Sequence, residues 1–426
     1  MLERCVARGQ DEFAAEIWGR QPLLSRAAQL PRDFSDLLGP AMVDEIIAER
    51  GVRTPFVRMA REGTLVDRAC FTRAAGFGAQ IPDQIDPDGV LTQFAAGATI
   101  VLQGLHRFWP PIIDFARAMT SDVGHPAQTN AYITPPANRG FDPHYDVHDV
   151  FVLQVSGTKR WRVHEPVHHH PLADQPWTDH REAISARAKD EPVIDAVLEP
   201  GDCLYLPRGW VHSAEAQGET SIHLTVGVAP FTGHDVVRAA LEALASEEEL
   251  RASLPLGVAL TDPAQTQEHT REVLAAIARL ATEKQEQLSV VAGAELARQY
   301  QDLTRPVAVR PLATLDAVAA LDADTPLCWR EGLIGAVRCD GPGNAARTGG
   351  PDTSSSDTSS SDNSSPDPVR LTLPTKTLTF PAICAPALRA ALDGNPVTAS
   401  ALPGLDAADG LVLLRRLLRE GVLVAL

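Results

Sequence analysis

Three side chains in this sequence have the types and the spacing to hold one metal ion. His144 and Asp146 lie two residues apart, just before a run rich in β-branched and aromatic residues. On an extended segment, residues i and i+2 point to the same side, so these two side chains can face a single ion. The segment 200–212 reads as a turn, a short strand and a second tight turn, and it ends at a third candidate ligand, His212. Two histidines and one carboxylate, with the other coordination positions open, are typical of non-haem Fe(II) oxygenases.

Other residues compete for such a role. His148 has the same strand parity as His144 and Asp146, so it could be a substitute ligand or a substrate contact, although a structural histidine is the favoured interpretation. The histidine run 168–170 could chelate a metal, but its flanking prolines favour a solvated loop. Cys203 is expected to be a small buried apolar residue and not a ligand.

The strand expected over residues 159–163 could supply a buried cation. Lys159 shares one face of this strand with Trp161 and Val163, whereas the two arginines between them share the other face. A lysine grouped with apolar residues is predicted to point inward, where an unpaired ammonium group is costly and a bound carboxylate would satisfy it. The alternative is that Lys159 extends to solvent.

The surrounding elements indicate how these side chains are positioned. From residue 129 to 228, short strands alternate with Gly, Pro and Asn turns, which is typical of a sandwich or barrel and not of alternating βα units. The segment 165–199 separates the two halves of the metal motif and is predicted to be mostly surface loop and helix.

The part of the chain before this region is predicted to be mostly helical. Asp33, Ser35 and Asp36 are expected to cap the second of its helices. Prolines 110 and 111 suit the first turn of the last helix. The expected helices are 12–18, 33–38, 41–49 and 108–119, with a buried strand at 95–102.

The order of these motifs resembles the JmjC branch of the cupin superfamily, and most closely the ribosomal oxygenases, which are Fe(II)- and 2-oxoglutarate-dependent protein hydroxylases. The segments that carry the resemblance, besides the metal motif, are 13–24, 130–135, 150–154 and 159–163. The resemblance covers residues 1–235 in detail and the rest of the chain more loosely. It implies a mainly β catalytic domain, a double-stranded β-helix with flanking helices.

The resemblance also implies roles for individual residues. His144, Asp146 and His212 would be the iron ligands, leaving open positions for 2-oxoglutarate and dioxygen. Oxidative decarboxylation of 2-oxoglutarate to succinate would then be coupled to hydroxylation of a C–H bond.

The far carboxylate of 2-oxoglutarate needs a partner, and Lys159 matches the position that supplies it in this family. Tyr132 matches a tyrosine whose hydroxyl helps to hold that carboxylate, although an ordinary core tyrosine is the alternative. Thr225 is a weaker candidate for a third contact. His223 shares a face with Thr225 and would line the same site.

The rest of the chain is expected to form two further parts. Residues 236–305 show apolar side chains at helical spacing and resemble the helices through which related oxygenases dimerise, although packing against the chain's own barrel is the alternative. Residues 306–426 resemble a winged-helix domain. Within them, the Ser/Asp-rich segment 349–368 is predicted to be disordered, because it holds too few apolar residues to offset its ordering entropy. No basic recognition helix stands out, so DNA binding is the minority interpretation.

Composition limits the partners. The net charge of −17 disfavours nucleic acid or an anionic membrane, and it suits a basic protein. The six cysteines are scattered with no C-x-x-C pair, and no apolar run reaches membrane length, so a soluble cytoplasmic protein is expected.

The sequence therefore predicts an Fe(II)/2-oxoglutarate dioxygenase that hydroxylates a side chain of a protein, with a basic ribosomal protein as the leading candidate substrate. The alternatives are an oxygenase acting on a small molecule or peptide, and a metal-binding cupin without turnover. Demethylation of methyl-lysine is a further alternative and ranks last, because the chain has no obvious chromatin-reader segment.

Overall fold

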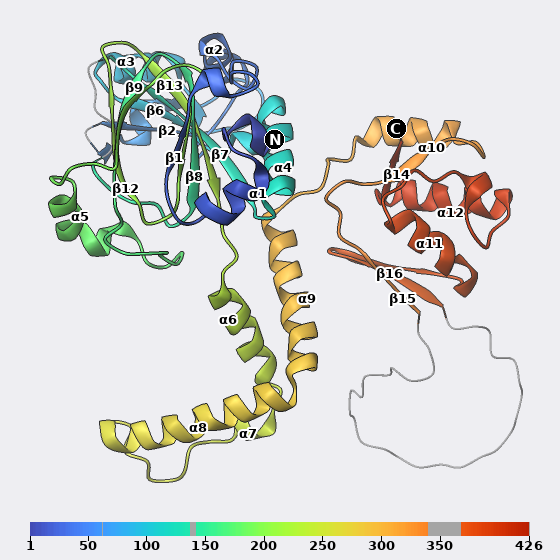
Figure 1. The fold of residues 1–426 in the computed structure, drawn as a ribbon. Helices are drawn as coiled ribbons and strands as arrows, with labels where there is room; N and C mark the ends of the chain where they lie inside the picture. Colours follow the sequence, from blue (N-terminus) through green and yellow to red (C-terminus); the bar gives the residue numbers. More distant parts are fainter. Residues whose placement is uncertain (62, 137–141, 340–367, 426) are drawn as a thin grey trace, which may run out of the picture. The chain divides into compact units, whose positions relative to one another are not determined.

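The structure is a computed structural model that describes the whole chain except residues 62, 137–141, 340–367 and 426 (Figure 1). It separates into two compact units, Met1–Thr232 and Gly233–Leu426. Among the described residues, none of the helices combines the length and the apolar character needed to cross a membrane.

The first unit is built on two antiparallel sheets. The larger sheet has the strand order β1-β11-β8-β13-β7-β6-β2-β3, and the smaller one has the order β10-β9-β12. The strands of the larger sheet are β1 (Leu23–Ser25), β2 (Val57–Arg61), β3 (Thr64–Leu65), β6 (Thr99–Leu102), β7 (Ala127–Thr134), β8 (Asp149–Ser156), β11 (Cys203–Leu206) and β13 (Ser221–Val228). Those of the smaller sheet are β9 (Lys159–His164), β10 (Ile194–Leu198) and β12 (Val211–Ala216), and a separate pair is formed by β4 (Thr72–Arg73) and β5 (Gln84–Ile85).

The turn at Gly157 carries the chain from the larger sheet to the smaller one. Gly157 has φ +60°, a left-handed conformation that glycine adopts without a steric penalty. A Cβ atom here would collide with the carbonyl of Thr220, so the turn requires glycine. This turn places Lys159 at the first position of β9.

The two faces of β8 serve two different cores. Phe151 and Leu153 belong to a large apolar cluster between the larger sheet and the helices, whereas Val150 and Val152 pack with Trp161 between the two sheets. Each such fully buried side chain contributes about 1.5–3 kcal/mol. Because side chains alternate between its two faces, β8 packs against the helices on one side and against the smaller sheet on the other.

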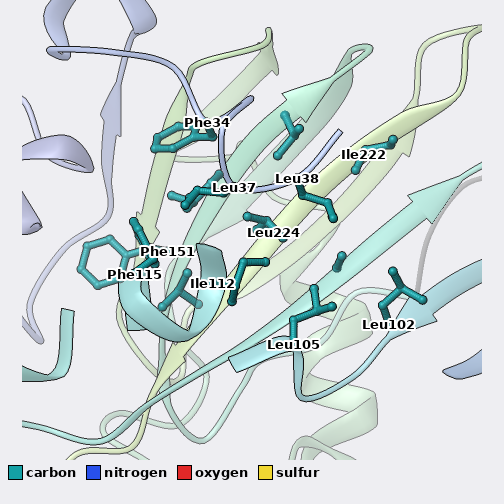
Figure 2. Packing of buried hydrophobic residues seen from close by; sticks show 14 of the residues in the cluster. Phe34, Leu37, Leu38, Leu102, Leu105, Ile112, Phe115, Phe151, Ile222 and Leu224 are labelled. Carbon is teal, nitrogen blue, oxygen red and sulfur yellow. The ribbon is translucent and has the colours of Figure 1, made fainter. Parts of the chain in front are cut away.

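Helices cover the outer face of the larger sheet. Figure 2 shows Ile112 and Phe115 of one helix beside Phe151 and Leu224 of the sheet. The helices in contact with this core are α2 (Pro40–Glu49), α3 (Pro87–Ala95) and α4 (Pro110–Val123). Each of the three begins with proline in its first turn, as expected for the helix from prolines 110 and 111. The predicted helices 41–49 and 108–119 are confirmed within about four residues at their ends.

The predicted helix at 33–38 is wrong. The carboxylate of Asp33 accepts hydrogen bonds from the backbone N–H (3.1 Å) and the hydroxyl (2.8 Å) of Ser35, which makes a local turn and not a helix cap. The predicted helix at 12–18 is a short turn of α1 (Gln10–Glu12) continued by a π-turn over Phe13–Ile17. The strand expected at 95–102 is shorter, because α3 ends at Ala95 and β6 begins at Thr99.

The segment between the two halves of the metal motif is mostly loop and helix, as predicted, with one short strand that was not expected. It contains a 3-10 turn, η6 (Trp177–His180), and α5 (Arg181–Arg187), but its last part forms β10 against β9. This strand was missed because it is only five residues long and its outer face mixes Asp195 with Val197. Asp195 forms two hydrogen bonds of 2.6 Å with Arg160 across the strands.

The second unit begins with helices and ends in a small α+β core. The helices are α6 (Gly233–Leu244), α7 (Glu248–Arg251), α8 (Pro263–Glu283) and α9 (Gln285–Leu303). The α+β part comprises α10 (Pro311–Ala320), β14 (Leu327–Trp329), β15 (Ala336–Cys339), β16 (Val369–Leu373), β17 (Lys376–Phe380), α11 (Ala385–Leu392), α12 (Ala407–Arg419) and β18 (Leu423–Ala425). The Ser/Asp-rich segment predicted to be disordered, 349–368, lies outside the described residues up to 367. The division of the chain into three domains and the winged-helix comparison stay predictions.

Candidate metal centre

The three predicted ligands come together at one end of the space between the two sheets. His144 and Asp146 lie in the segment that enters β8, and His212 is the second residue of β12. Their ligand atoms all lie within 4.8 Å of one another, and Nε2 of His212 is 3.7 Å from Oδ2 of Asp146. Among the described residues, no other group of three or more histidine, cysteine or acidic side chains is arranged this way.

Main-chain hydrogen bonds join the two segments that carry the ligands. The N–H of His144 donates to the carbonyl of His212 (3.1 Å), and the N–H of His212 donates back to the carbonyl of His144 (2.8 Å). The N–H of Gly209 also donates to the carbonyl of Asp146 (3.0 Å). The distance between the ligands is thus set by the backbone and not by side-chain rotamers alone.

Both histidines have one ring nitrogen engaged by a carbonyl group. Nδ1 of His144 is 2.7 Å from the carbonyl oxygen of Asp142, and Nδ1 of His212 is 3.0 Å from that of Trp210. These contacts require the proton on Nδ1, which leaves the lone pair of each Nε2 for a metal. The two rings lie 4.5 Å apart.

Burial and mutual repulsion keep the ligands in the state that binds a metal. Burial, together with the neighbouring His144, lowers the pKa of His212 to about 4, so its imidazole is neutral at pH 7. Burial alone would raise the pKa of Asp146, but the nearby His212 and His144 outweigh it and hold that pKa below its ordinary value. The neutral imidazole of His212 and the ionised carboxylate of Asp146 are donors that a divalent cation prefers.

A cavity of about 80 Å³ extends from the triad between the sheets. Lys159 lies in its wall and is only 3% exposed, and its Nζ donates to Oγ1 of Thr134 (3.0 Å). No carboxylate of the described residues forms an ion pair with it, and burial lowers the pKa of Lys159 to about 7. As predicted, Lys159 points inward, whereas Arg160 and Arg162 lie on the other face and pair with Asp195.

Tyr132, His223 and Thr225 also line this cavity. Tyr132 and His223 are direct partners on neighbouring strands, and their rings stack at 5.1 Å with a 5° angle between planes. Burial and the charge of Lys159 keep the pKa of His223 well below its usual range, so this ring is neutral. Its Nδ1 is buried without a hydrogen-bond partner among the described residues. Thr225 lies two residues further along β13 on the same face.

Arg58 was not predicted from the sequence. Across the larger sheet, Arg58 pairs with Val101, Val101 pairs with Tyr132, and Tyr132 pairs with His223, so all four side chains point to the cavity face. The guanidinium group of Arg58 forms a hydrogen bond with the phenol of Tyr132. Burial and Asp146 raise the pKa of Tyr132, with Arg58 opposing them. Only the strand register reveals this contact, because nothing in residues 57–61 marks it.

The remaining sequence candidates lie elsewhere. The ring of His148 packs against Gly227, where a Cβ atom would lie only 3.0 Å from it, and it does not line the cavity. His168 bonds to Gln175 and stacks on His180, so the histidine run is not simply a solvated loop. Cys203 is fully buried in the apolar core, as expected.

The part of the chain that holds this site matches a known family of protein domains. Residues 106–236 match the family model described as JmjC domain. The chain therefore carries a JmjC domain. The matched residues include all three candidate ligands as well as Tyr132, Lys159 and Thr225.

Curated relatives share this half of the chain. Ribosomal oxygenase 1 of Bos taurus is 33% identical over 217 residues, and its human counterpart is 32% identical over the same length. A protein of Drosophila erecta named bifunctional lysine-specific demethylase and histidyl-hydroxylase NO66 is 31% identical over 226 residues. Each match covers 51% of this chain, but only 31% or 32% of the relative, so the chain spans about a third of the length of these proteins.

Solved structures from Escherichia coli also match the chain, at low sequence identity. The ribosomal oxygenase YcfD matches with a TM-score of 0.49 and 16% identity, and the match covers 98% of both chains. A structure of YcfD in complex with cobalt and 2-oxoglutarate matches with a TM-score of 0.48 over the same share of both chains.

Proposed function

We propose that this protein is an Fe(II)- and 2-oxoglutarate-dependent dioxygenase that hydroxylates a side chain of a protein substrate. His144, Asp146 and His212 would hold the iron through two Nε2 atoms and a carboxylate oxygen. This donor set fits Fe(II) because two imidazoles and one carboxylate on one side leave the other positions open. When bound, iron with 2-oxoglutarate and dioxygen supplies oxidative decarboxylation coupled to C–H hydroxylation.

The observation that carries the proposal is the buried ammonium group of Lys159. It lies in the same cavity as the triad, is almost fully buried, and has a neutral hydroxyl as its only hydrogen-bond partner among the described residues. A lysine in such a place is costly unless an anion joins it. A dicarboxylate that reaches from the metal to Lys159 supplies that anion, and 2-oxoglutarate has this chemistry.

The other cavity residues would orient the cosubstrate. The hydroxyls of Tyr132 and Thr225 can donate to a carboxylate, and the neutral ring of His223 offers a further polar contact. Trp161 meets His223 edge to face at 5.5 Å, which fixes the plane of that ring. Together these groups would exclude water from the far end of the cavity.

The proposed substrate is a basic protein, with ribosomal proteins as the first group to test. The net charge of −17 favours encounter with a basic partner over nucleic acid. The relatives named ribosomal oxygenase share the half of the chain that carries the site. We also propose a cytoplasmic location, supported by six free cysteines, which suit a reducing compartment.

We further propose that residues 236–305 mediate a homodimer. Large apolar side chains stay exposed along these helices within the second unit: Val236, Val237, Leu241, Val273, Leu274, Val290 and Val291. A second copy could cover such side chains, because exposed apolar surfaces of this extent are typical of interfaces.

Succinate formation tests the catalytic proposal. The wild type and His144→Ala should be incubated with 2-oxoglutarate, with Fe(II) added anaerobically before exposure to air. Product should be followed for hours, because turnover without the prime substrate is slow. We expect metal-dependent succinate from the wild type and none from the variant. Ribosomal proteins incubated with the enzyme would then be searched by mass spectrometry for the gain of one oxygen atom.

Two other outcomes would change the proposal. No succinate together with no binding of 2-oxoglutarate to the metal-loaded protein would indicate a metal-binding cupin without turnover. Succinate formation stimulated by small molecules or short peptides, but by no ribosomal protein, would indicate a different substrate class.

A further inference from the structure

Tyr145, which lies between the ligands His144 and Asp146, forms a hydrogen bond with the segment that connects β9 to β10. Tyr145 is fully buried, and its hydroxyl donates to the carbonyl of Gln175 (3.1 Å). Its ring belongs to a small apolar cluster with Ile184 and Val211, against which Val167 and Trp177 also pack. This cluster is separate from the main cores of the unit.

Gln175 and two histidines stabilise the connection itself. The side-chain oxygen of Gln175 accepts from the N–H of Leu172 (2.9 Å) and lies 3.1 Å from Nε2 of His168. The ring of His168 stacks on that of His180 at 4.8 Å and 20°, and His180 lies 6.1 Å from the ring of Tyr145. His180 thus packs between His168 of this connection and Tyr145 of the loop that carries His144 and Asp146.

The same connection contacts the second ligand-bearing segment. Gly209 lies in the turn that leads to His212 and has φ +87°. A Cβ atom on it would lie 2.6 Å from the carbonyl oxygen of His168 and 2.9 Å from Cδ of Pro171. The connection also reaches a ligand directly, because the ring of Trp177 lies 6.0 Å from that of His144.

We propose that residues 167–184, called here the clamp, position the metal ligands, and that Tyr145 is the residue through which the clamp acts on His144 and Asp146. The inference rests on the proposed metal centre and extends it. None of the clamp residues donates an atom to the metal, so Tyr145, Gln175 and His180 are positioning residues. Their contribution is to restrict the side chains of the loop 142–148, in addition to the main-chain hydrogen bonds that join His144 to His212 and Asp146 to Gly209.

The physical reason is preorganisation. A metal site binds more tightly when its ligands already have the required geometry, because no conformational entropy is lost on binding. Groups outside the ligand set that orient metal ligands typically change metal affinity by about 10- to 100-fold. Tyr145 acts one step further out, so we expect an effect of about tenfold at that site.

Three variants and a matched control test the clamp in the full chain. Tyr145→Phe removes one hydroxyl and keeps the ring. His180→Ala removes the ring stacked on His168, and His180→Phe restores a ring at the same place. His169→Ala is the control, because this histidine lies in the same loop and is exposed, whereas it is the neighbouring His168 that bonds to Gln175.

Cobalt(II) serves as the probe, since its visible absorption reports ligand geometry without turnover. For Tyr145→Phe and His180→Ala we expect about tenfold weaker cobalt binding and an altered visible spectrum. The melting temperature of the metal-free protein should match that of the wild type. His180→Phe and His169→Ala should bind cobalt as the wild type does.

The outcomes separate the clamp from the metal centre. Wild-type cobalt affinity and spectrum in both Tyr145→Phe and His180→Ala would overturn the clamp and leave the metal centre intact. If His180→Phe failed to restore binding while His169→Ala also lost it, the loop would act nonspecifically and the clamp would again be overturned. Absence of cobalt binding by the wild type, or undiminished binding in His144→Ala, would overturn the metal centre itself.

Discussion

Replacing Lys159 with methionine should stabilise the metal-free protein while abolishing binding of 2-oxoglutarate. Burial lowers the pKa of Lys159 from 10.5 to about 7. One pKa unit corresponds to about 1.4 kcal/mol, so at pH 7 this difference costs the folded state roughly 4 kcal/mol. Methionine has a similar length and no charge, but it leaves Oγ1 of Thr134 without its donor, which costs about 1 kcal/mol. The net expectation is a gain on the order of 3 kcal/mol.

The gain should depend on pH in a defined direction. The folded-state pKa is lower than the unfolded one, so folding between pH about 7 and pH 10.5 expels a proton from Lys159. The cost is therefore full below pH about 7 and disappears as the pH rises toward 10.5. At pH 9 the cost should be about 2 kcal/mol, so the net advantage of Lys159→Met should fall from about 3 kcal/mol at pH 7 to about 1 kcal/mol at pH 9.

Urea unfolding followed by tryptophan fluorescence measures this advantage. Five of the six tryptophans lie in the first unit, so the signal reports mainly the unit that contains Lys159. Binding of 2-oxoglutarate to the metal-loaded variant, measured by calorimetry, should be lost. If Lys159→Met were less stable than the wild type by the same amount at both pH values, the ammonium group would be satisfied within the fold. The argument for an anion-binding role would then fail.

Three further results are expected. The affinity of the metal-loaded wild type for 2-oxoglutarate should be constant below pH 7 and should fall at higher pH. The reason is that the ammonium group of Lys159, with a pKa of about 7 without ligand, loses its proton. Calorimetry across this range measures the affinity, and an affinity unchanged at pH 9 would contradict the reasoning. Gly209→Ala should lower the free energy of unfolding by roughly 2 kcal/mol or more, since a Cβ atom at φ +87° meets the carbonyl of His168 at 2.6 Å; a denaturant midpoint equal to that of the wild type would refute this. Arg58→Met and Tyr132→Phe should each weaken 2-oxoglutarate binding. The double variant should bind no more weakly than either single variant, because both changes remove one shared hydrogen bond. Strictly additive losses of affinity would show that Arg58 does not act through Tyr132.

The alternation of residue types along a strand allowed the direction of side chains to be predicted where one face of the strand is fully buried. The inward direction of Lys159 could be predicted because Trp161 and Val163 share its face, and a one-residue shift would expose all three. The pairing of His144 with Asp146 also followed from spacing alone. The third ligand, His212, was predicted from the turns and short strand of residues 200–212 and supported by the resemblance, but its place beside His144 depends on main-chain pairing that spacing alone does not give.

Prediction from the sequence failed where a side chain forms a local hydrogen bond that replaces a helix, and where a contact depends on the strand register. Asp33 favours helix starts in general, but here it bonds to its own neighbour Ser35 and forms a turn. The strand β10 is short, and its outward-facing Asp195 pairs with Arg160, which is distant in sequence, so it looked like a loop. Arg58 reaches Tyr132 only across two intervening strand pairings, and no local pattern encodes that distance.

The paired main-chain hydrogen bonds between His144 and His212 bear on how the protein would acquire its metal. Because the backbone itself holds these two residues together, the ligands are assembled as soon as the two sheets close, whether or not an ion is present. Metal would then be a ligand of an already folded protein and would stabilise it by mass action, by about 2.7 kcal/mol at a hundredfold excess over Kd. This differs from small zinc domains, which unfold when their metal is removed. Under the proposed function, loss of the metal would leave a folded protein that can rebind it without a new round of folding.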